Sequence, residues 1–491
     1  MHHRSEPLLR AAAAAAASKA SDFKPQELAN LVWAYASMEY RDDKMLAAVA
    51  RQAHSLAEQF NEQELSNLIW GLGKLRYGDP ALFSHLLRCV ASKLHAFTPQ
   101  VRARAPPTLP AEPRRSLARL PLQLLLLPLL LPLLLPLLPV SACLSQAETQ
   151  TPRRRRDRRR RRRLQGIANV AWGIATAGHR DEPLFRRLLS KCVRELPAND
   201  VQGLANLMWA AGALGVRDEA FMAAAVGECC RRADDLSPQQ LANVLWACVT
   251  LDWADPRAIA RLADAAAARS GGFEPQALSN CAWALARLGA APGAAPGAAR
   301  PQAFEALAAA ALPKARAFTA QGCANLLWAF ATAGHPHPKL FDAIGGQAVQ
   351  RIDSFSPHNC SVTAWACASA RHYSPALCDA LLARALGASA AAAAPSAQPP
   401  EGGVDGDAGE RAGAAPLAPQ GAANLLWALA RLGHPVAGGP HAGALRDAAV
   451  RLMPSMARQE LCNSGWALAA LGLMDGRAWG AFCAALGAAD V

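Results

Sequence analysis

Tryptophan recurs along this chain at an interval of 37 residues, and this interval restricts the fold more than any other feature of the sequence. The three consecutive steps between Trp172 and Trp283 all have this length. Each tryptophan closes the same phrase, which reads Phe-Lys-Pro-Gln-Glu-Leu-Ala-Asn-Leu-Val-Trp over residues 23–33. The phrase occurs ten times, ending at Trp33, Trp70, Trp172, Trp209, Trp246, Trp283, Trp328, Trp365, Trp427 and Trp466. A period of this length predicts stacked supersecondary units.

Each repeat contains the start and stop signals of two helices. With the opening Phe or its equivalent as position 0, N-cap residues often stand at position 1 and proline at position 2. Glycine, which favours a left-handed C-cap, often lies six residues after the tryptophan, at Gly178, Gly215, Gly289, Gly334, Gly433 and Gly472. Aspartate and proline then open a second helix, as at Asp79-Pro80. We therefore expect an all-α fold, an α-solenoid (superhelix) of about ten 37-residue two-helix repeats.

Departures from the 37-residue interval predict the domain organisation. Repeats 1 and 2 and the start of repeat 3 occupy residues 22–100. Repeats 3–8 occupy residues 166–388, and repeats 9 and 10 occupy residues 417–491. The loop 290–301 and the tract 389–416 are rich in Ala, Pro and Gly, so we expect the first to be flexible and the second to be disordered.

The largest insertion, residues 101–165, interrupts the third repeat. Phe97-Thr-Pro-Gln100 opens the phrase, and Gly166-Ile-Ala-Asn-Val-Ala-Trp172 completes it. Removing these 65 residues reduces the interval from Trp70 to Trp172 from 102 to 37. The segment begins with Val, whose codon starts with GT, and a CAG codon for Gln165 would supply a closing AG. We hypothesise that it is a retained intron, and transcripts that always include it would contradict this.

The same segment carries most of the net charge of the chain. Of the formal charge of +13, residues 101–165 contribute +12, from 15 arginines and three acidic residues, which leaves +1 for the remainder. Basicity is therefore weak evidence for a nucleic-acid partner. The segment also contains the apolar stretch from Leu120 to Val140, but five prolines within it argue against a transmembrane helix. We expect a soluble protein without membrane insertion.

The chain has no recognisable catalytic or metal-binding motif. Its 13 cysteines include no CxxC pair, and those that recur within the phrase are interpreted as reduced core thiols: Cys281, Cys323, Cys360 and Cys462. The sequence also lacks HExxH, Walker A and GxSxG motifs. We therefore expect no enzyme activity, metal site, cofactor or small-molecule substrate.

On a helical wheel, the first helix of each repeat has an apolar face and a polar stripe. Positions 5, 8, 9 and 12 cluster on one face, whereas positions 3, 7 and 14 share the opposite one. Position 3 is Gln except at His358, and position 7 is Asn except at Val362, both in the eighth repeat. The position-7 residues are Asn30, Asn67, Asn169, Asn206, Asn243, Asn280, Asn325, Asn424 and Asn463. Position 14 varies, and its candidate contact residues are Lys74, Thr176, Thr250, Arg287, Thr332 and Arg431.

Two interpretations of this stripe remain open. The amides either form a buried ladder that ties each helix to the backbone of its neighbour, or contact successive phosphates or sugars of one strand. Uniform residues cannot encode a sequence, so position 14 is where we expect bases to be read if each repeat meets one base. The tryptophan flanks the stripe beside small residues such as Gly71 and Gly173. We interpret the tryptophan as a residue that packs between repeats rather than one that stacks on a base.

The phrase F-x-P-Q-x-L-A-N-x-x-W-A, followed by A-x-L-G and a second helix, resembles the heptatricopeptide and octotricopeptide repeats of organellar RNA-binding proteins. That group includes FAST-kinase-like leucine-rich proteins, RAP-associated proteins and a component of the RNA-editing substrate-binding complex. The resemblance implies a single-stranded RNA-binding protein acting in organellar RNA processing, stability, translation or ribosome assembly, without catalysis of its own. It implies organellar RNA and other ribonucleoprotein subunits as partners, in a mitochondrion or chloroplast.

Three points limit the resemblance. Many relatives end in a small RAP domain, whereas this sequence stops at Val491, within the second helix of the tenth repeat. Residues 1–21 are interpreted as the remnant of a transit peptide. The near-neutral repeats also suit an alternative function, an armadillo- or HEAT-like scaffold that binds proteins. RNA binding that weakens with salt would distinguish the two functions, because phosphate contacts release counterions.

Overall fold

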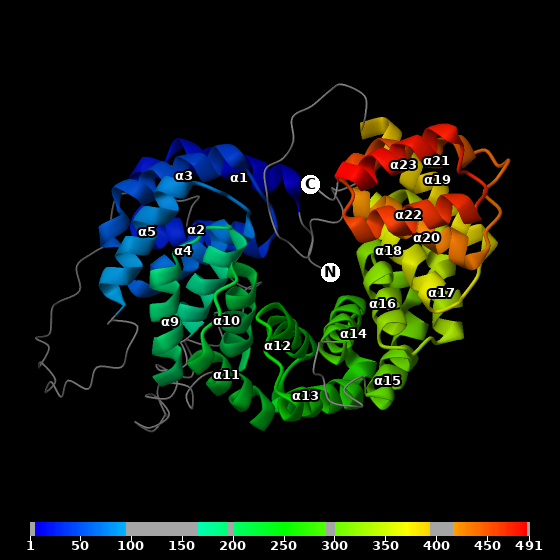
Figure 1. Ribbon diagram of the computed structural model, residues 1–491. Helices are drawn as coiled ribbons and strands as arrows, with labels where there is room; N and C mark the ends of the chain where they lie inside the picture. Colours follow the sequence, from blue (N-terminus) through cyan, green and yellow to red (C-terminus); the bar gives the residue numbers. More distant parts are fainter. Residues whose placement is uncertain (1–4, 95–164, 195–200, 291–299, 393–415, 489–491) are drawn as a thin grey trace, which may run out of the picture.

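The computed structural model describes residues 5–94, 165–194, 201–290, 300–392 and 416–488. These residues form α-helices and short 3₁₀ turns, and no strand occurs among them. The helices pair and stack into a curved, two-layered array that bends into an almost closed ring (Figure 1). The predicted all-α solenoid is therefore confirmed.

The first helices of the repeats form the inner layer of the ring (Figure 1). Each first helix packs against the first helix of the next repeat. These pairs are the most extensively packed pairs of elements in the stack. The inner helices are α2 (Pro25–Ser37), α4 (Glu62–Lys74), the helix 165–176, α10 (Val201–Leu214), α12 (Pro238–Thr250), α14 (Pro275–Gly289), α16 (Ala320–Thr332), α18 (Pro357–Ser369), α20 (Pro419–Leu432) and α22 (Arg458–Ala470).

The second helices form the outer layer. They are α3 (Asp43–Ser55), α5 (Pro80–Lys93), α9 (Glu182–Arg194), α11 (Glu219–Arg231), α13 (Pro256–Arg269), α15 (Pro301–Ala311), α17 (Pro338–Gln350), α19 (Pro375–Ala392), α21 (Ala442–Leu452) and α23 (Gly476–Ala488). Helix α1 (Glu6–Ser18) extends this layer, since it packs against α3 and its Leu9 carbonyl accepts a hydrogen bond from Tyr35 Oη at 3.0 Å. The segment interpreted as a transit-peptide remnant thus contains an outer-layer helix of the stack.

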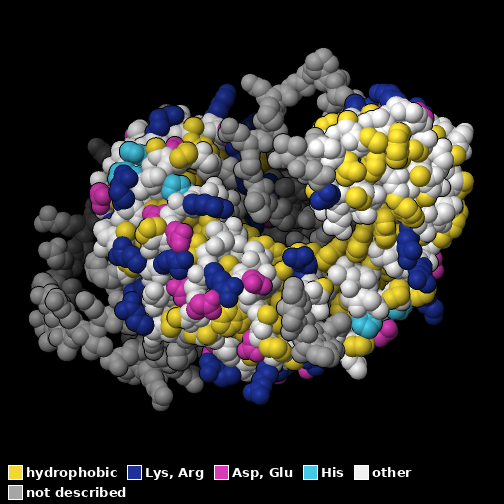
Figure 2. Space-filling model, in the orientation of Figure 1, with side chains coloured by type: hydrophobic (Ala, Val, Ile, Leu, Met, Phe, Trp, Pro, Cys, Tyr) yellow, Lys and Arg dark blue, Asp and Glu magenta, His cyan; other side chains and the backbone are white. Residues whose placement is uncertain are grey.

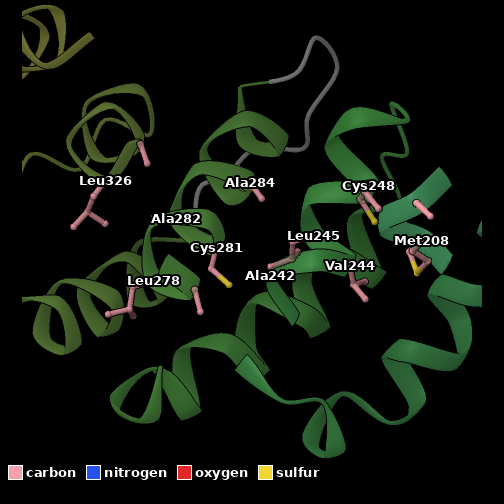
Figure 3. Packing of buried hydrophobic residues seen from close by; sticks show 14 of the residues in the cluster. Met208, Ala242, Val244, Leu245, Cys248, Leu278, Cys281, Ala282, Ala284 and Leu326 are labelled. Carbon is pink, nitrogen blue, oxygen red and sulfur yellow. The ribbon is translucent and has the colours of Figure 1, made fainter. Parts of the chain in front are cut away.

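The core lies between the two layers and is continuous along the array. Figure 3 shows Val244, Leu245 and Cys248 of α12, at positions 8, 9 and 12, directed toward buried neighbours from adjacent helices. The buried opening residues of the repeats, such as Phe60 and Phe273, close the core at each junction. The apolar face predicted from the wheel is therefore the face that packs.

The helix starts have the predicted caps. Ser237 Oγ accepts the Gln240 amide at 3.3 Å, and Thr319 Oγ1 accepts the Gly322 amide at 3.1 Å. Second helices begin in the same way, since Asp79 Oδ1 accepts a backbone amide at 3.0 Å. The predicted caps at position 1 of repeats 3 and 4 fall outside the described residues.

The helix ends confirm five of the six predicted left-handed glycines: Gly178, Gly215, Gly334, Gly433 and Gly472. Gly289 was predicted wrongly, because α14 continues through it and the inserted loop follows directly. The sequence pattern also missed four non-glycine residues that adopt the same conformation at this position, with φ of 53° or 54°: Glu39, Arg76, Asp252 and Arg371.

The insertions leave the stack in register. The ring centroids of Trp70 and Trp172 lie 6.0 Å apart, and those of Trp172 and Trp209 lie 6.1 Å apart, although the first pair is separated by 102 residues and the second by 37. The segment 101–164 lies outside the described residues, as do 291–299 and 393–415. Helix α19 extends to Ala392, so the first residues of the tract expected to be disordered are helical.

Candidate nucleic-acid interface

The asparagines of position 7 lie on the solvent-facing side of the inner layer. Asn30 is exposed, and the others are partly exposed: Asn67, Asn169, Asn206, Asn243, Asn280, Asn325, Asn424 and Asn463. The hydrogen bonds that define their arrangement run along a helix, from Gln63 Nε2 to Asn67 Oδ1 at 2.9 Å and from Gln239 Nε2 to Asn243 Oδ1 at 3.0 Å. Within the described residues, no bond ties these asparagines to a neighbouring helix. The amides therefore form an accessible stripe, and the buried ladder is not found.

The threonines of position 14 are turned toward their own helix. Thr176 Oγ1 donates to the Trp172 carbonyl at 2.8 Å, and Thr250 Oγ1 donates to the Trp246 carbonyl at 2.9 Å. Thr332 Oγ1 is buried and has no hydrogen-bond partner in the described part of the chain. Because the hydroxyls of Thr176 and Thr250 already donate their protons to these carbonyls, each can only accept a hydrogen bond from a ligand.

The basic residues of position 14 differ in whether their charge is ion-paired. Lys74 Nζ forms an ion pair with Glu39 Oε1 at 3.0 Å and lies 5.9 Å from the centre of the Trp70 ring. Arg287 and Arg431 are exposed in the last turns of α14 and α20, and neither is ion-paired within the described ranges. These two arginines are the predicted contact residues whose charge remains available to a phosphate.

The tryptophans form stacked rows along one edge of the amide stripe. Ring centroids of Trp209 and Trp246 lie 6.2 Å apart, and those of Trp283 and Trp328 lie 6.4 Å apart. A Cβ added to Gly212 would lie 2.7 Å from Trp246 Cζ3, so the small residue allows the indole to lie against the preceding helix. The predicted packing role is therefore confirmed. Most of these indoles nevertheless remain only partly buried and contribute to the accessible surface.

Five other basic residues join the two helices of their repeats. Within the second helix or just after it, a Lys or Arg side chain donates to the backbone carbonyl of the residue that opens the same repeat. The pairs are Lys93 with Phe60 at 2.6 Å, Lys314 with Phe273 at 2.5 Å, Arg351 with Phe318 at 2.9 Å, Arg384 with Phe355 at 2.9 Å, and Arg269 with Leu236. We call these contacts junction clasps, because each acceptor lies where two repeats join.

The junction clasps were not predicted, although the sequence contains a signal for them. Lys93, Arg269 and Arg351 each stand 33 residues after the opening residue of their repeat. A positive charge at a helix C-terminus is also favoured by the helix dipole. These cations are bound to backbone carbonyls where the repeats join, and none of them belongs to position 3, 7 or 14 of the phrase.

The eighth repeat interrupts the stripe. His358 replaces Gln and is exposed, and the partly exposed Val362 replaces Asn. A valine side chain has no hydrogen-bonding group, so one step along the inner layer lacks the amide contact of the others.

Comparisons with known proteins assign no family. No protein-family model matches the chain, and no curated protein matches it. One similar solved structure is a homology model of the full-length AP-3 complex in an intermediate open conformation, which is 9% identical. The match covers 95% of this chain and 90% of that chain at a TM-score of 0.21, too low to support an argument. The structure itself shows an all-helical repeat protein of the helical-solenoid kind.

None of the helices in the described ranges is both long and apolar enough to cross a bilayer. The stretch from Leu120 to Val140 lies outside these ranges.

Proposed function

We propose that this protein binds single-stranded RNA along the inner layer of its solenoid, as the organellar helical-repeat proteins that it resembles do. The observation that supports the proposal is the accessible row of glutamine and asparagine amides beside partly exposed, stacked indoles. The protein would hold RNA during processing, stabilisation, translation or ribosome assembly in a mitochondrion or chloroplast. It would act there without catalysis of its own, together with other ribonucleoprotein subunits.

The chemistry of the stripe fits a sugar–phosphate strand. A primary amide offers both donors and an acceptor, so it can bind a phosphate oxygen or a ribose 2′-hydroxyl. The same pair of amides recurs in each repeat except the eighth, which would give one similar contact per step along a strand. The variable position 14 then supplies the contact that differs from one nucleotide to the next.

Electrostatics would make a small contribution to affinity. The repeats carry little net charge, and of the position-14 residues Arg287 and Arg431 carry unpaired cations in the described part of the stack. Two neutralised phosphates on a single strand would give a slope of log K against log salt of about −1.4, and this is the upper limit of its steepness, because an arginine that contacts a base neutralises no phosphate. A shallow negative slope is therefore expected, in contrast with the steep slope of strongly basic RNA-binding proteins.

The decisive experiment measures binding of fluorescent single-stranded RNAs at two salt concentrations to the wild-type chain and three variants. Arg287→Ala should change the preference at one nucleotide by about 1–3 kcal/mol, because a base contact at position 14 is lost. Asn243→Ala should weaken binding to all sequences about equally, because it contacts the backbone of the strand. Arg257→Ala removes one charge from the exposed side of α13 in the outer layer and should leave binding unchanged.

Two results would contradict the proposal. Absence of RNA binding at low salt would favour the protein-binding scaffold. Equal effects of Arg287→Ala and Arg257→Ala would mean that net charge, and not the inner surface, governs binding.

A further inference from the structure

Three side chains with metal-binding atoms meet in the outer layer, in a place separate from the amide stripe. His85 and Cys89 stand four residues apart on one face of α5. Glu58 belongs to the 3₁₀ turn Ala57–Gln59, which precedes α4. Glu58 Oε1 lies 3.4 Å from Cys89 Sγ and 3.9 Å from His85 Nε2, and the three ligand atoms lie within 4.8 Å of one another.

These separations are close to those of a tetrahedral metal site. Zinc–ligand bonds of about 2.0–2.3 Å at tetrahedral angles place ligand atoms roughly 3.3–3.7 Å apart. The carboxylate–thiol distance falls within that range, and the carboxylate–imidazole distance exceeds it slightly. The third separation, between the Cys89 thiol and the His85 imidazole, is at most 4.8 Å.

The turn that carries Glu58 is held in place by a junction clasp. Lys93 Nζ donates to the Glu58 carbonyl and to the Phe60 carbonyl, both at 2.6 Å. The backbone of the acidic ligand is therefore tied to the helix that carries the other two. Such an arrangement limits the loss of backbone freedom when the side chains converge.

The two ring nitrogens of His85 differ in their surroundings. Nε2 faces the Glu58 carboxylate at 3.9 Å, whereas Nδ1 is buried and has no hydrogen-bond partner in the described residues. Nε2 is therefore the nitrogen that the cluster presents to a metal ion. His54, exposed on α3, packs edge-on against His85 with 4.6 Å between ring centroids, and so lies beside the cluster.

We propose that Glu58, His85 and Cys89 bind a zinc(II) ion, whose fourth position is taken by water. A thiolate, an imidazole and a carboxylate together suit zinc, whereas magnesium and calcium favour oxygen ligands alone. Binding replaces the Cys89 S–H bond with an S–Zn bond and releases one proton to the buffer. Burial and the hydrogen bond to Glu58 raise the pKa of the free thiol to about 11, so the metal must displace that proton.

The test is equilibrium dialysis of the full chain against zinc(II) in a non-chelating reductant, followed by metal analysis. Glu58→Gln and Cys89→Ser should each lower the affinity of this site at least tenfold, whereas Cys192→Ser, which alters a buried thiol of α9, should not. The Glu58 side chain is 73% exposed, so Glu58→Gln should fold normally even if a buried cysteine variant does not. Zinc bound at the exposed Cys462 or Cys483 would be common to all four proteins.

Cobalt(II) supplies a second measurement on the same proteins. The wild-type chain and Cys192→Ser should show a thiolate-to-cobalt charge-transfer band and intense tetrahedral d–d bands, and Cys89→Ser should lose the thiolate band. The proposal is overturned if wild-type protein shows no saturable zinc binding, or if Glu58→Gln and Cys89→Ser bind zinc as tightly as Cys192→Ser.

Discussion

At the scale of single residues, the position six residues after the tryptophan adopts a left-handed backbone conformation both in repeats with glycine there and in repeats with another residue. Five glycines adopt positive φ there without steric cost. Four other repeats place a side chain in the same left-handed conformation, where a Cβ costs roughly 1–2 kcal/mol. The stack therefore imposes the turn even where the local residue disfavours it.

Arg371 offers a test of this strain, because it is exposed and has a φ of 54°. Arg371→Gly should raise the free energy of unfolding by about 0.5–1 kcal/mol, since relief of strain exceeds the entropy that glycine gains in the unfolded chain. Arg371→Ala is the matched control, because it removes the side chain but keeps the Cβ. Urea denaturation of both variants provides the measurement, and an equal gain from both would show that backbone strain is not the cause.

Contacts within a single helical turn were predictable, whereas contacts between residues far apart in the sequence were not. The caps Ser237 and Thr319 were predicted because each bonds an amide three residues later. The junction clasp of Arg269 connects atoms more than 30 residues apart, so its meaning depends on the fold. The pairing of Glu58 with Cys89 was missed for the same reason, since neither lies in a recognised metal motif.

At the scale of helices, the small residues beside the tryptophan set the distance between neighbouring repeats. A Cβ on Gly173 would lie 2.6 Å from the Ile69 carbonyl oxygen of α4. That oxygen belongs to the backbone of a helix and cannot move aside as a flexible side chain would. The helix 165–176 and α4 therefore approach to a distance that only glycine permits at this site.

The corresponding prediction concerns two glycines in helices. Gly173→Ala should lower the free energy of unfolding by about 2 kcal/mol or more, because the added methyl group overpacks the contact. Gly227→Ala, at an exposed site of α11 with nothing within 4 Å of the new Cβ, should instead raise it by about 0.5–1 kcal/mol. Thermal melts followed by circular dichroism would compare the two, and equal shifts would disprove the close approach.

The burial of side chains was predicted correctly inside the array and incorrectly at its end. The wheel identified Cys281, Cys323 and Cys360 as core thiols, and all three are buried. The same reasoning failed for Cys462, which is exposed on α22, as is Trp466 at 51% of its surface. Periodicity assigns a residue to a face, but burial of that face requires another helix against it, and in the described residues none follows α22 in the inner layer.

At the scale of the whole molecule, the stack is a one-dimensional series in which each repeat contacts mainly its neighbours. The repeats on either side of residues 101–165 meet as closely as uninterrupted ones, as the Trp70–Trp172 contact shows. The interval of 37 residues therefore predicted the architecture correctly, because the same local contacts are repeated along the array. The ligand leaves no such periodic signal, since position 14 varies from repeat to repeat.

Deletion of residues 101–165 tests whether the packing of the repeats is independent of the inserted segment. The shortened chain should be strongly helical by circular dichroism, and its melting temperature should lie within a few degrees of that of the full chain, because the contacts between α4 and the helix 165–176 are retained. A large fall in melting temperature would show that the segment stabilises the stack. A sheet content near the globular average of about 20–25% would contradict the two-helix repeat itself.

The row of indoles also gives the molecule a collective optical property. Centroid separations of 6.0–6.2 Å connect Trp70, Trp172, Trp209 and Trp246. At such separations, excitation energy transfers between neighbouring indoles before it is emitted. Light absorbed by one tryptophan is therefore emitted by another of different orientation, and the fluorescence of the folded chain is depolarised even when the chain itself is still. A quencher in contact with any one of these four rings dims the emission of the whole run.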